Sequence, residues 1–96
     1  MLNVSIYVEN AEALKVLAHP VRITILKELI IRGACNVNQL AEILDIPQST
    51  VSQHLLKMKS KKLVMKDRRG VEVYYSAPNK QFNSIVEIIT RKIPII

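Results

Sequence analysis

Cysteine is almost absent from this chain, which carries only Cys35. A single thiol excludes an intrachain disulfide, so we expect the protein to work in a reducing compartment. Long apolar runs are missing, and the N-terminus has neither a basic start nor an extended hydrophobic stretch. The sequence therefore predicts no membrane span and no signal peptide, and we expect a cytoplasmic protein.

The groupings that enzymes use are also missing. There is no glycine-rich phosphate loop, no cluster of carboxylates and no nucleophile with a general base near it in the sequence. We therefore predict that the protein is not an enzyme and needs no cofactor. Its 96 residues, 49% of them hydrophobic, are enough for one compact core, so residues 1–96 are expected to form a single domain.

Residues 47–59 are the stretch around which the rest of the chain is organised. Pro47 suits the first turn of a helix, and Val51, Leu55 and Met58 recur at helical spacing as a core stripe. The opposite side carries uncharged polar groups and one leucine: Ser49, Ser52, Gln53, Leu56 and Ser60. Such a face is either ordinary solvated surface or a surface that hydrogen-bonds the edges of DNA bases, and the helix alone does not decide between the two.

The preceding segment indicates a second, short helix. Asn36 and Gln39 have the spacing of a capping box, and an apolar stripe follows at Val37, Leu40 and Leu44. Only a tight corner, residues 45–46, separates this helix from Pro47. Two helices joined by so short a turn predict a helix-turn-helix over about 36–60.

A hairpin is predicted after the second helix. Residues 62–67 and 71–76 alternate and are rich in β-branched or aromatic side chains, with Arg68, Arg69 and Gly70 between them. A basic hairpin beside a recognition helix is a wing, here over about 62–77, which reaches phosphates or the minor groove. The predicted fold is mainly α with a small β-hairpin (α+β), a winged helix-turn-helix.

The positive charge is concentrated on these elements. From Ile46 to Gly70 seven positive residues face the single negative Asp67, a balance equal to the net charge of the whole chain, +6. The seven are Lys57, Lys59, Lys61, Lys62, Lys66, Arg68 and Arg69. A solvated basic face is the usual explanation of such a run. Its coincidence with the predicted helix and wing favours double-stranded DNA as the partner.

The two ends of the chain carry further apolar patterns. Residues 2–8 alternate with a period of two, which indicates an extended arm that could pair with a partner subunit, with a helical or disordered start as alternatives. A helix is predicted from Asn10 to Ala18, and Pro20 breaks it. The next helix runs from Pro20 to Arg32, and Gly33 is predicted to end it in a left-handed conformation.

A last helix, opened by residues 78–79, is apolar on more than one narrow stripe. It either closes its own core or leaves an apolar face for a second copy of the chain, and the second interpretation predicts a homodimer joined through residues 1–18 and 79–96. Two recognition helices would then lie about 34 Å apart, which matches successive major grooves. The predicted interface residues are Leu14, Phe82, Ile85, Val86, Ile89 and Ile93.

Several segments together resemble the bacterial ArsR/SmtB transcriptional repressors. They are Leu17-Ala18-His19-Pro20-Val21-Arg22, Gln39-Leu40-Ala41, Ser49-Thr50-Val51-Ser52-Gln53-His54-Leu55, Arg69-Gly70 and Tyr74-Tyr75. The resemblance covers residues near 10 to 80 and implies a dimeric, nucleoid-associated repressor that occupies a palindromic operator and excludes RNA polymerase. It implies DNA contacts from Gln48, Ser49, Thr50, Ser52, Gln53 and His54, with Arg68 and Arg69 at the wing tip. Lys57 is added to these contacts because it belongs to the run of positive residues described above.

Leu56 stands where many members have Lys or Arg, and we expect it to pack against a neighbour rather than touch a thymine methyl.

The chain departs from this family at its metal-sensing positions. The usual cysteines line up with Asn36 and Asn38, and residues 79–96 contain no His or Asp and only Glu87. A tight transition-metal site needs three or four soft or imidazole ligands, so we expect no metal and no metal response.

The histidines and the cysteine have other expected roles. His19 is expected to be structural, and His54 to contact a phosphate or to have a role within its own helix. Cys35 is expected to be a small buried filler, with a redox-responsive repressor as an alternative function. The other alternative is a winged helix used only for protein-protein interaction, which a salt titration would distinguish from DNA binding.

Overall fold

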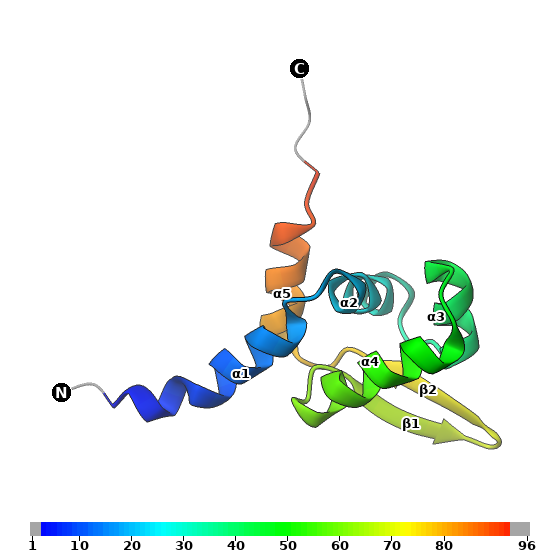
Figure 1. Ribbon diagram of the computed structural model, residues 1–96, viewed down its shortest axis with the longest axis horizontal. Helices are drawn as coiled ribbons and strands as arrows, with labels where there is room; N and C mark the ends of the chain where they lie inside the picture. Colours follow the sequence, from blue (N-terminus) through cyan, green and yellow to red (C-terminus); the bar gives the residue numbers. More distant parts are fainter. Residues whose placement is uncertain (1–2, 93–96) are drawn as a thin grey trace.

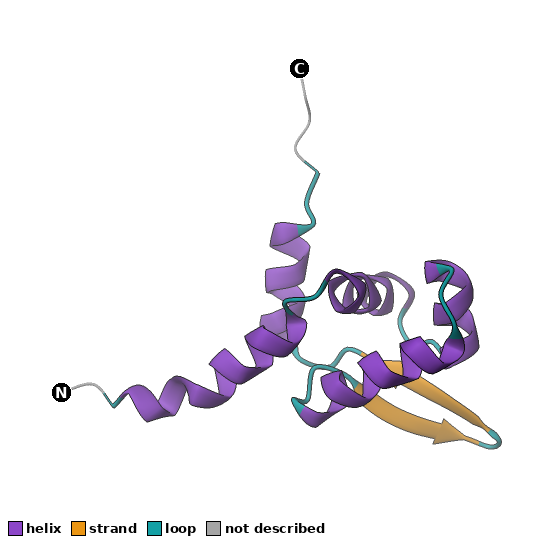
Figure 2. Ribbon diagram, in the orientation of Figure 1, coloured by secondary structure: helices purple, strands orange, loops and turns teal. Residues whose placement is uncertain are grey.

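The computed structural model describes residues 3–92, which form a flat molecule, 50 × 42 × 20 Å, whose elements are labelled in Figure 1. Within that range five α-helices and one hairpin occur in the order η1 (Val4–Tyr7, a 3-10 turn), α1 (Val8–Leu17), α2 (Pro20–Arg32), α3 (Val37–Leu44), α4 (Gln48–Ser60), β1 (Met65–Arg69), β2 (Glu72–Ser76) and α5 (Lys80–Ile89). Helices α2, α3 and α4 and the hairpin make the body, from which α1 and α5 project in different directions (Figures 1 and 2). This is a winged helix-turn-helix: α3 and α4 are its two helices, and the antiparallel β1–β2 hairpin is its wing. None of the helices described here has the length and apolar character needed to cross a membrane.

One core holds these elements together. Val51, Leu55 and Met58 of α4 are fully buried, as the helical spacing predicts. They share a single cluster with Ile25, Leu26 and Leu29 of α2, and with residues of α1, α3 and α5. The buried half of α4 therefore fixes the recognition helix to the body and leaves its other half exposed.

Capping residues set the limits of α2 and α3. The Asn36 side chain accepts from the Gln39 amide and the Gln39 side chain accepts from the Asn36 amide, each at 2.8 Å, so the predicted capping box is confirmed. Helix α2 has the predicted bounds, and His19 Nδ1 caps it by accepting from Val21 N–H at 3.1 Å. Gly33 has the expected positive φ of 82°, but its ψ of −131° is not left-handed helical, so only the sign of φ is as predicted.

The turn between α3 and α4 is as tight as the sequence indicates. Asp45 takes a left-handed conformation with a φ of 55°, which reverses the chain after α3. Pro47 is the N-cap of α4 with an extended ψ of 146°, so it precedes the helix instead of occupying its first turn.

From Val4 to Leu17 the chain is helical, which corrects the extended arm favoured by the alternating pattern over residues 2–8, of which Leu2 lies outside the described residues. Asn3 Oδ1 accepts from the Ser5 amide and hydroxyl and begins the turn of η1, and α1 starts at Val8 rather than Asn10. An alternating strand needs a partner edge, and β1 and β2, the strands of the described residues, pair with each other. Without such an edge, local capping decides the conformation. Val4, Ile6 and Tyr7 stay exposed.

The wing is shorter than predicted. Lys62 has a φ of 59° in a turn, Leu63 and Val64 are buried, and β1 begins only at Met65. Arg68 and Arg69 belong to β1, where Arg69 pairs with Glu72, so the loop is Gly70-Val71 rather than the two arginines. Gly70 has a φ of 65°, the sign that a tight two-residue hairpin turn requires at its first position.

Helix α5 closes the core of this chain and also leaves apolar side chains exposed. Asn79 Oδ1 caps it by accepting from Phe82 N–H. Phe82 and Val86 are buried in the core of this chain, which removes them from the expected dimer interface, because little of their surface remains to contact a partner. Ile85 and Ile89 are exposed, whereas Ile93 lies outside the described residues.

Candidate nucleic-acid interface

The exposed side of α4 carries the side chains that the sequence places there. Ser49, Ser52, Gln53 and Leu56 are all exposed and recur at helical spacing opposite Val51 and Leu55. We call these four residues the reading face. We expected Leu56 to pack against a neighbour. It keeps 69% of its surface exposed, so within the described chain it does not do so to any large extent. Hydroxyl, amide and methyl groups can contact base edges without the cost of burying a charge.

Two predicted DNA contacts, Thr50 and His54, are half-buried at the edge of this face. His54 Nδ1 accepts a hydrogen bond from Arg22 Nε at 3.1 Å, and its ring lies 4.6 Å from that of His19. Burial lowers the pKa of His54, and the neighbouring His19, Arg22 and Lys57 lower it further. Nδ1 of His54 therefore already has a hydrogen-bond partner within the protein.

Gln48, at the start of α4, is held by the preceding helix. Its side-chain amide donates to Asn38 Oδ1 on the exposed surface of α3. Asn36 Nδ2 contacts Glu72 Oε2 of β2 at 3.4 Å. These contacts connect the N-terminal end of α3 with both elements that are predicted to meet DNA.

The wing displays the two predicted arginines in different environments. Arg69 Nε lies 3.1 Å from Asp67 Oδ2, and its guanidinium carbon lies 4.9 Å from the centre of the Tyr74 ring. Arg68 Nε donates to the Gly70 carbonyl at 3.1 Å, so the side chain follows the turn at the tip. Both arginines are exposed and can reach phosphates.

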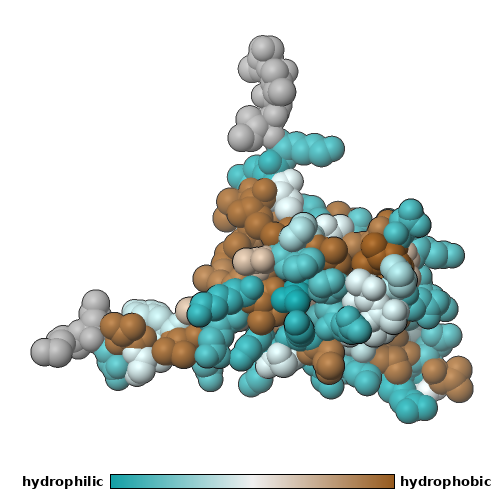
Figure 3. Space-filling view, viewed as in Figure 1, coloured by the Kyte–Doolittle hydropathy of each residue, from teal (hydrophilic) through white to brown (hydrophobic). Residues whose placement is uncertain are grey.

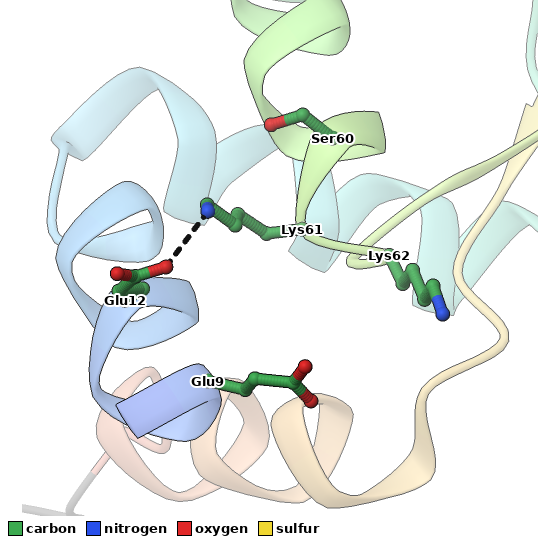
Figure 4. A pocket seen from close by; sticks show the side chains of 5 residues that line it. All are labelled: Glu9, Glu12, Ser60, Lys61 and Lys62. Atoms are coloured by element: carbon green, nitrogen blue, oxygen red, sulfur yellow. Dashed lines mark hydrogen bonds and ion pairs between the residues drawn. The ribbon is translucent and has the colours of Figure 1, made fainter. Parts of the chain in front are cut away.

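Most positive charges around α4 have no carboxylate partner among residues 3–92. The ion pairs found there are Arg32–Glu28, Lys61–Glu12 and Arg69–Asp67, which leaves Lys57, Lys59, Lys62 and Lys66 unpaired. In Figure 4, Lys61 points from the end of α4 to Glu12 of α1 across a small hollow. That hydrogen bond, 2.9 Å long, lowers the pKa of the Glu12 carboxyl. The unpaired lysines supply the field that attracts a polyanion.

An apolar surface covers a different part of the molecule. In Figure 3 hydrophobic residues gather along the projecting α5 and α1, away from α4 and the wing. Exposed members of this surface are Leu14 of α1 and Ile85, Ile88 and Ile89 of α5, and we call these four residues the apolar face. Ile88, 61% exposed, was not among the predicted interface residues.

Cys35, Asn36 and Asn38 lie at or just before the start of α3. Cys35 is 2% exposed, and burial raises the pKa of its thiol, so little reactive thiolate forms. Its backbone pairs with that of Tyr75 in β2, so Cys35 is tied to the wing. Asn36 and Asn38 use their side chains in hydrogen bonds, and no group of three His, Cys, Asp or Glu residues in the described chain is placed to hold a metal ion.

Two side-chain contacts near this interface have no signal in the sequence: Arg22 with His54, and Asn38 with Gln48. Arg22 reaches His54 across 32 positions and Asn38 reaches Gln48 across 10 positions. Neither pair has a periodic or motif signal, because each contact forms only when separate helices pack together.

Known proteins resemble this chain in both sequence and fold. Residues 17–67 match the family described as a helix-turn-helix domain. The chain is 47% identical over 81 residues to the transcriptional repressor PagR of Bacillus anthracis, which covers 84% of this chain and 81% of the relative. It is 40% identical over 75 residues to the HTH-type transcriptional repressor SmtB of Mycobacterium tuberculosis, which covers 78% of this chain and 55% of that longer protein.

Solved structures show the same similarity in three dimensions. The crystal structure of PagR superposes with a TM-score of 0.80 at 45% identity, and the match covers 85% of this chain and 93% of PagR. The homodimeric winged helix-turn-helix DNA-binding domain Mb0332 of Mycobacterium bovis, described as a possible ArsR-family regulator, superposes with a TM-score of 0.79 at 25% identity. That match covers 93% of this chain and 89% of the Mb0332 fragment.

Proposed function

This chain belongs to the ArsR/SmtB family of winged helix-turn-helix transcriptional repressors, and from that premise we propose that two copies of it occupy a palindromic operator and exclude RNA polymerase. It is a DNA-binding transcriptional repressor and not an enzyme. The proposal adds the dimer, the operator symmetry and the contacting residues.

The observation that carries the proposal is the division of α4 into two halves. Its buried half is locked in the core, while the reading face is exposed among unpaired lysines and beside the wing. We assign base contacts to Ser49, Ser52 and Gln53, and phosphate contacts to Lys57, Arg68 and Arg69. Gln48 and Thr50 lie at the margin of this surface and complete the proposed set, and His54 beside them accepts a hydrogen bond from Arg22.

The dimer is proposed through the apolar face. A cluster of exposed leucine and isoleucine side chains on projecting helices is costly for a lone chain in water. A twofold pairing through α1 and α5 would cover it and would leave both reading faces free. The structural neighbour Mb0332 is itself homodimeric, which supports this arrangement.

The experiment is a selection of duplexes from a random pool by the full-length protein, followed by affinity measurements on the selected duplex and on a scrambled one. We expect a palindromic consensus, and a logarithm of affinity that falls linearly with the logarithm of salt concentration. Affinity should be the same with and without added Zn(II), because the amides of Asn36 and Asn38 are poor ligands for zinc. No enriched sequence would refute the operator, and a large effect of zinc would refute metal independence.

A further inference from the structure

Three side chains meet where the α1–α2 corner touches the middle of α4. Arg22 Nε donates to His54 Nδ1 at 3.1 Å, and Arg22 Nη1 donates to the Val16 carbonyl at 2.9 Å. His19, whose Nδ1 caps α2, lies with its ring 4.6 Å from that of His54. One guanidinium from α2 therefore joins the end of α1 to the recognition helix.

The contact between Arg22 and His54 defines a protonation state. A guanidinium is always a donor, so the nitrogen that accepts from it carries no proton. Nδ1 of His54 is therefore unprotonated, and the neutral imidazole carries its proton on Nε2. A second proton can bind only at Nδ1, where it would remove the acceptor and place two cations against each other.

The surroundings of His54 oppose that second proton. The groups that act on its imidazole are His19 and Arg22 from the α1–α2 corner and Lys57 from the next turn of α4, and none of them is a carboxylate. Two α1 carboxylates, Glu9 and Glu12, line the hollow at the end of α4, where Glu12 is hydrogen-bonded to Lys61, as Figure 4 shows. Together with partial burial, these neighbours lower the pKa of His54.

The cluster lies between the two functional surfaces. Helix α1 carries Leu14 of the apolar face, and α4 carries the reading face. Arg22 connects the two helices near Val16, and the Lys61–Glu12 ion pair connects them again at the end of α4. The ion pair is solvent-exposed and contributes little, so Arg22 is the stronger constraint.

We propose that Arg22 is a positioning residue, which holds the recognition helix at a fixed angle to α1 through neutral His54, and that protonation of His54 releases α4 and weakens operator binding. This inference rests on the proposed function, because it needs a dimer in which the placement of α1 sets the placement of both reading faces. It predicts a DNA affinity that declines in acid.

A direct phosphate contact from His54 would give the opposite result. A protonated imidazole attracts phosphate, so binding would then strengthen as the pH falls. The sign of the pH dependence therefore separates a positioning role from a role in contacting DNA.

The test measures affinity for the duplex selected at pH 8.0 and for its scrambled form, from pH 8.0 to pH 4.5 at constant ionic strength. Circular dichroism at each pH confirms that the protein is folded. We expect the wild-type affinity for the selected duplex to fall by about tenfold for each pH unit below the pKa of His54, because only the neutral fraction is competent. Affinity for the scrambled duplex should fall less, since loose phosphate contacts do not need the fixed angle.

Two substitutions change the contact in different ways. His54→Asn places an amide oxygen near the position of Nδ1 but cannot titrate, so its pH profile should be flat. Arg22→Lys keeps the charge but cannot donate to Val16 and His54 at once, so it should bind the selected duplex more weakly at pH 8.0, with a flat profile. The matched control is His19→Asn, which keeps an acceptor for the α2 cap and should retain the decline in acid.

The outcomes distinguish this inference from the proposed function. Wild-type protein that selects no duplex at pH 8.0 would overturn both. Sequence-specific binding at pH 8.0 that stays constant or strengthens down to pH 4.5 would overturn the positioning role and leave the repressor proposal intact. A His54→Asn variant that keeps the wild-type pH profile would also overturn the positioning role alone.

Discussion

Leu56 shows at the scale of one residue how the structure changes an interpretation. Its helical phase places it with Ser49 and Gln53, and its exposure of 69% leaves it without a partner in this chain. A leucine is costly on a surface that only meets water, but it suits a surface that meets the methyl group of thymine. We therefore prefer the base contact to the packing role that the sequence favours.

Replacing thymine by uracil in the selected duplex tests this preference, because it removes only the methyl group. At the thymine that Leu56 contacts, we expect wild-type affinity to fall about fourfold, which corresponds to about 0.8 kcal/mol for one buried methyl-sized group. Leu56→Ala should bind both duplexes with the same lower affinity. Thymines elsewhere in the duplex serve as controls, and a Leu56→Ala variant that still prefers thymine at that position would rule out the contact.

His54 also makes a prediction for folding stability. Its folded-state pKa is lowered from the ordinary value of 6.5, so the unfolded chain binds this proton more readily than the folded one. The contribution of His54 to the free energy of unfolding is therefore complete above about pH 6.5 and declines as the pH falls below that value. Urea denaturation between pH 8 and pH 5 should show a smaller decline for His54→Asn than for the wild type, and parallel curves would contradict the lowered pKa.

Helix α3 shows how local sequence signals determine an element. The reciprocal hydrogen bonds of Asn36 and Gln39 begin it, and the left-handed Asp45 ends it. Asn36 also reaches Glu72 of the wing, so the same residue affects two elements. The helix itself follows from the sequence, whereas its contact with the wing does not.

Substitution of Asn36 should destabilise this helix. Asn36→Ala removes the acceptor for the Gln39 amide and should lower the free energy of unfolding by about 1 kcal/mol, as measured by urea denaturation at pH 7. Asn36→Ser keeps a capping oxygen and should lose much less. Equal stability of the alanine and serine variants would show that the cap contributes nothing measurable.

The wing is the element whose sequence signal is least accurate in detail. Its charge and hairpin form are as predicted, but the arginines lie in β1. Arg69 forms an ion pair with Asp67 and lies over the Tyr74 ring. Arg68 has no such ion pair among the described residues. We therefore expect Arg68 to contribute more to phosphate binding than Arg69.

The salt dependence of DNA binding measures that contribution. Arg68→Ala should weaken binding to selected and scrambled duplexes alike and should reduce the slope of log affinity against log salt by about one. Lys27→Ala, in α2 and outside both DNA-binding elements, removes the same charge and should leave the slope unchanged. An Arg68→Ala slope equal to that of the wild type would exclude the wing contact.

At the scale of the whole molecule, α5 carries some apolar residues that are buried in the core of its own chain and others that remain exposed. Phe82 and Val86 satisfy the core of a single chain, and Ile85, Ile88 and Ile89 on the same helix remain exposed. One α5 therefore has an inner side for folding and an outer side that we propose for association.

Charge on the outer side should separate the subunits. The double variant Ile85→Glu and Ile89→Glu should sediment as a folded monomer and bind the selected duplex at least about tenfold more weakly, since a lone chain holds only one half-site. Ile31→Glu, at an exposed isoleucine of α2, is the matched control and should stay dimeric. A double variant that remains a dimer would place the interface elsewhere.

The sequence by itself determined the helices that carry caps and apolar stripes, the exposed polar side of α4 and the location of the positive charge. These features depend on residues within a few positions of one another, where periodicity, capping and turn chemistry act directly. The same local rules were ambiguous at residues 3–9, because alternation indicates a strand only where a partner edge exists.

Only the tertiary structure decided which apolar residues of α5 are buried in the core, that Leu56 stays mostly exposed, and that Arg22 reaches His54. Each of these depends on how separate helices pack, and side chains 32 positions apart come into contact only after the core has fixed the orientation of their helices. No short-range pattern encodes that orientation, since it results from the shapes of all the buried side chains at once.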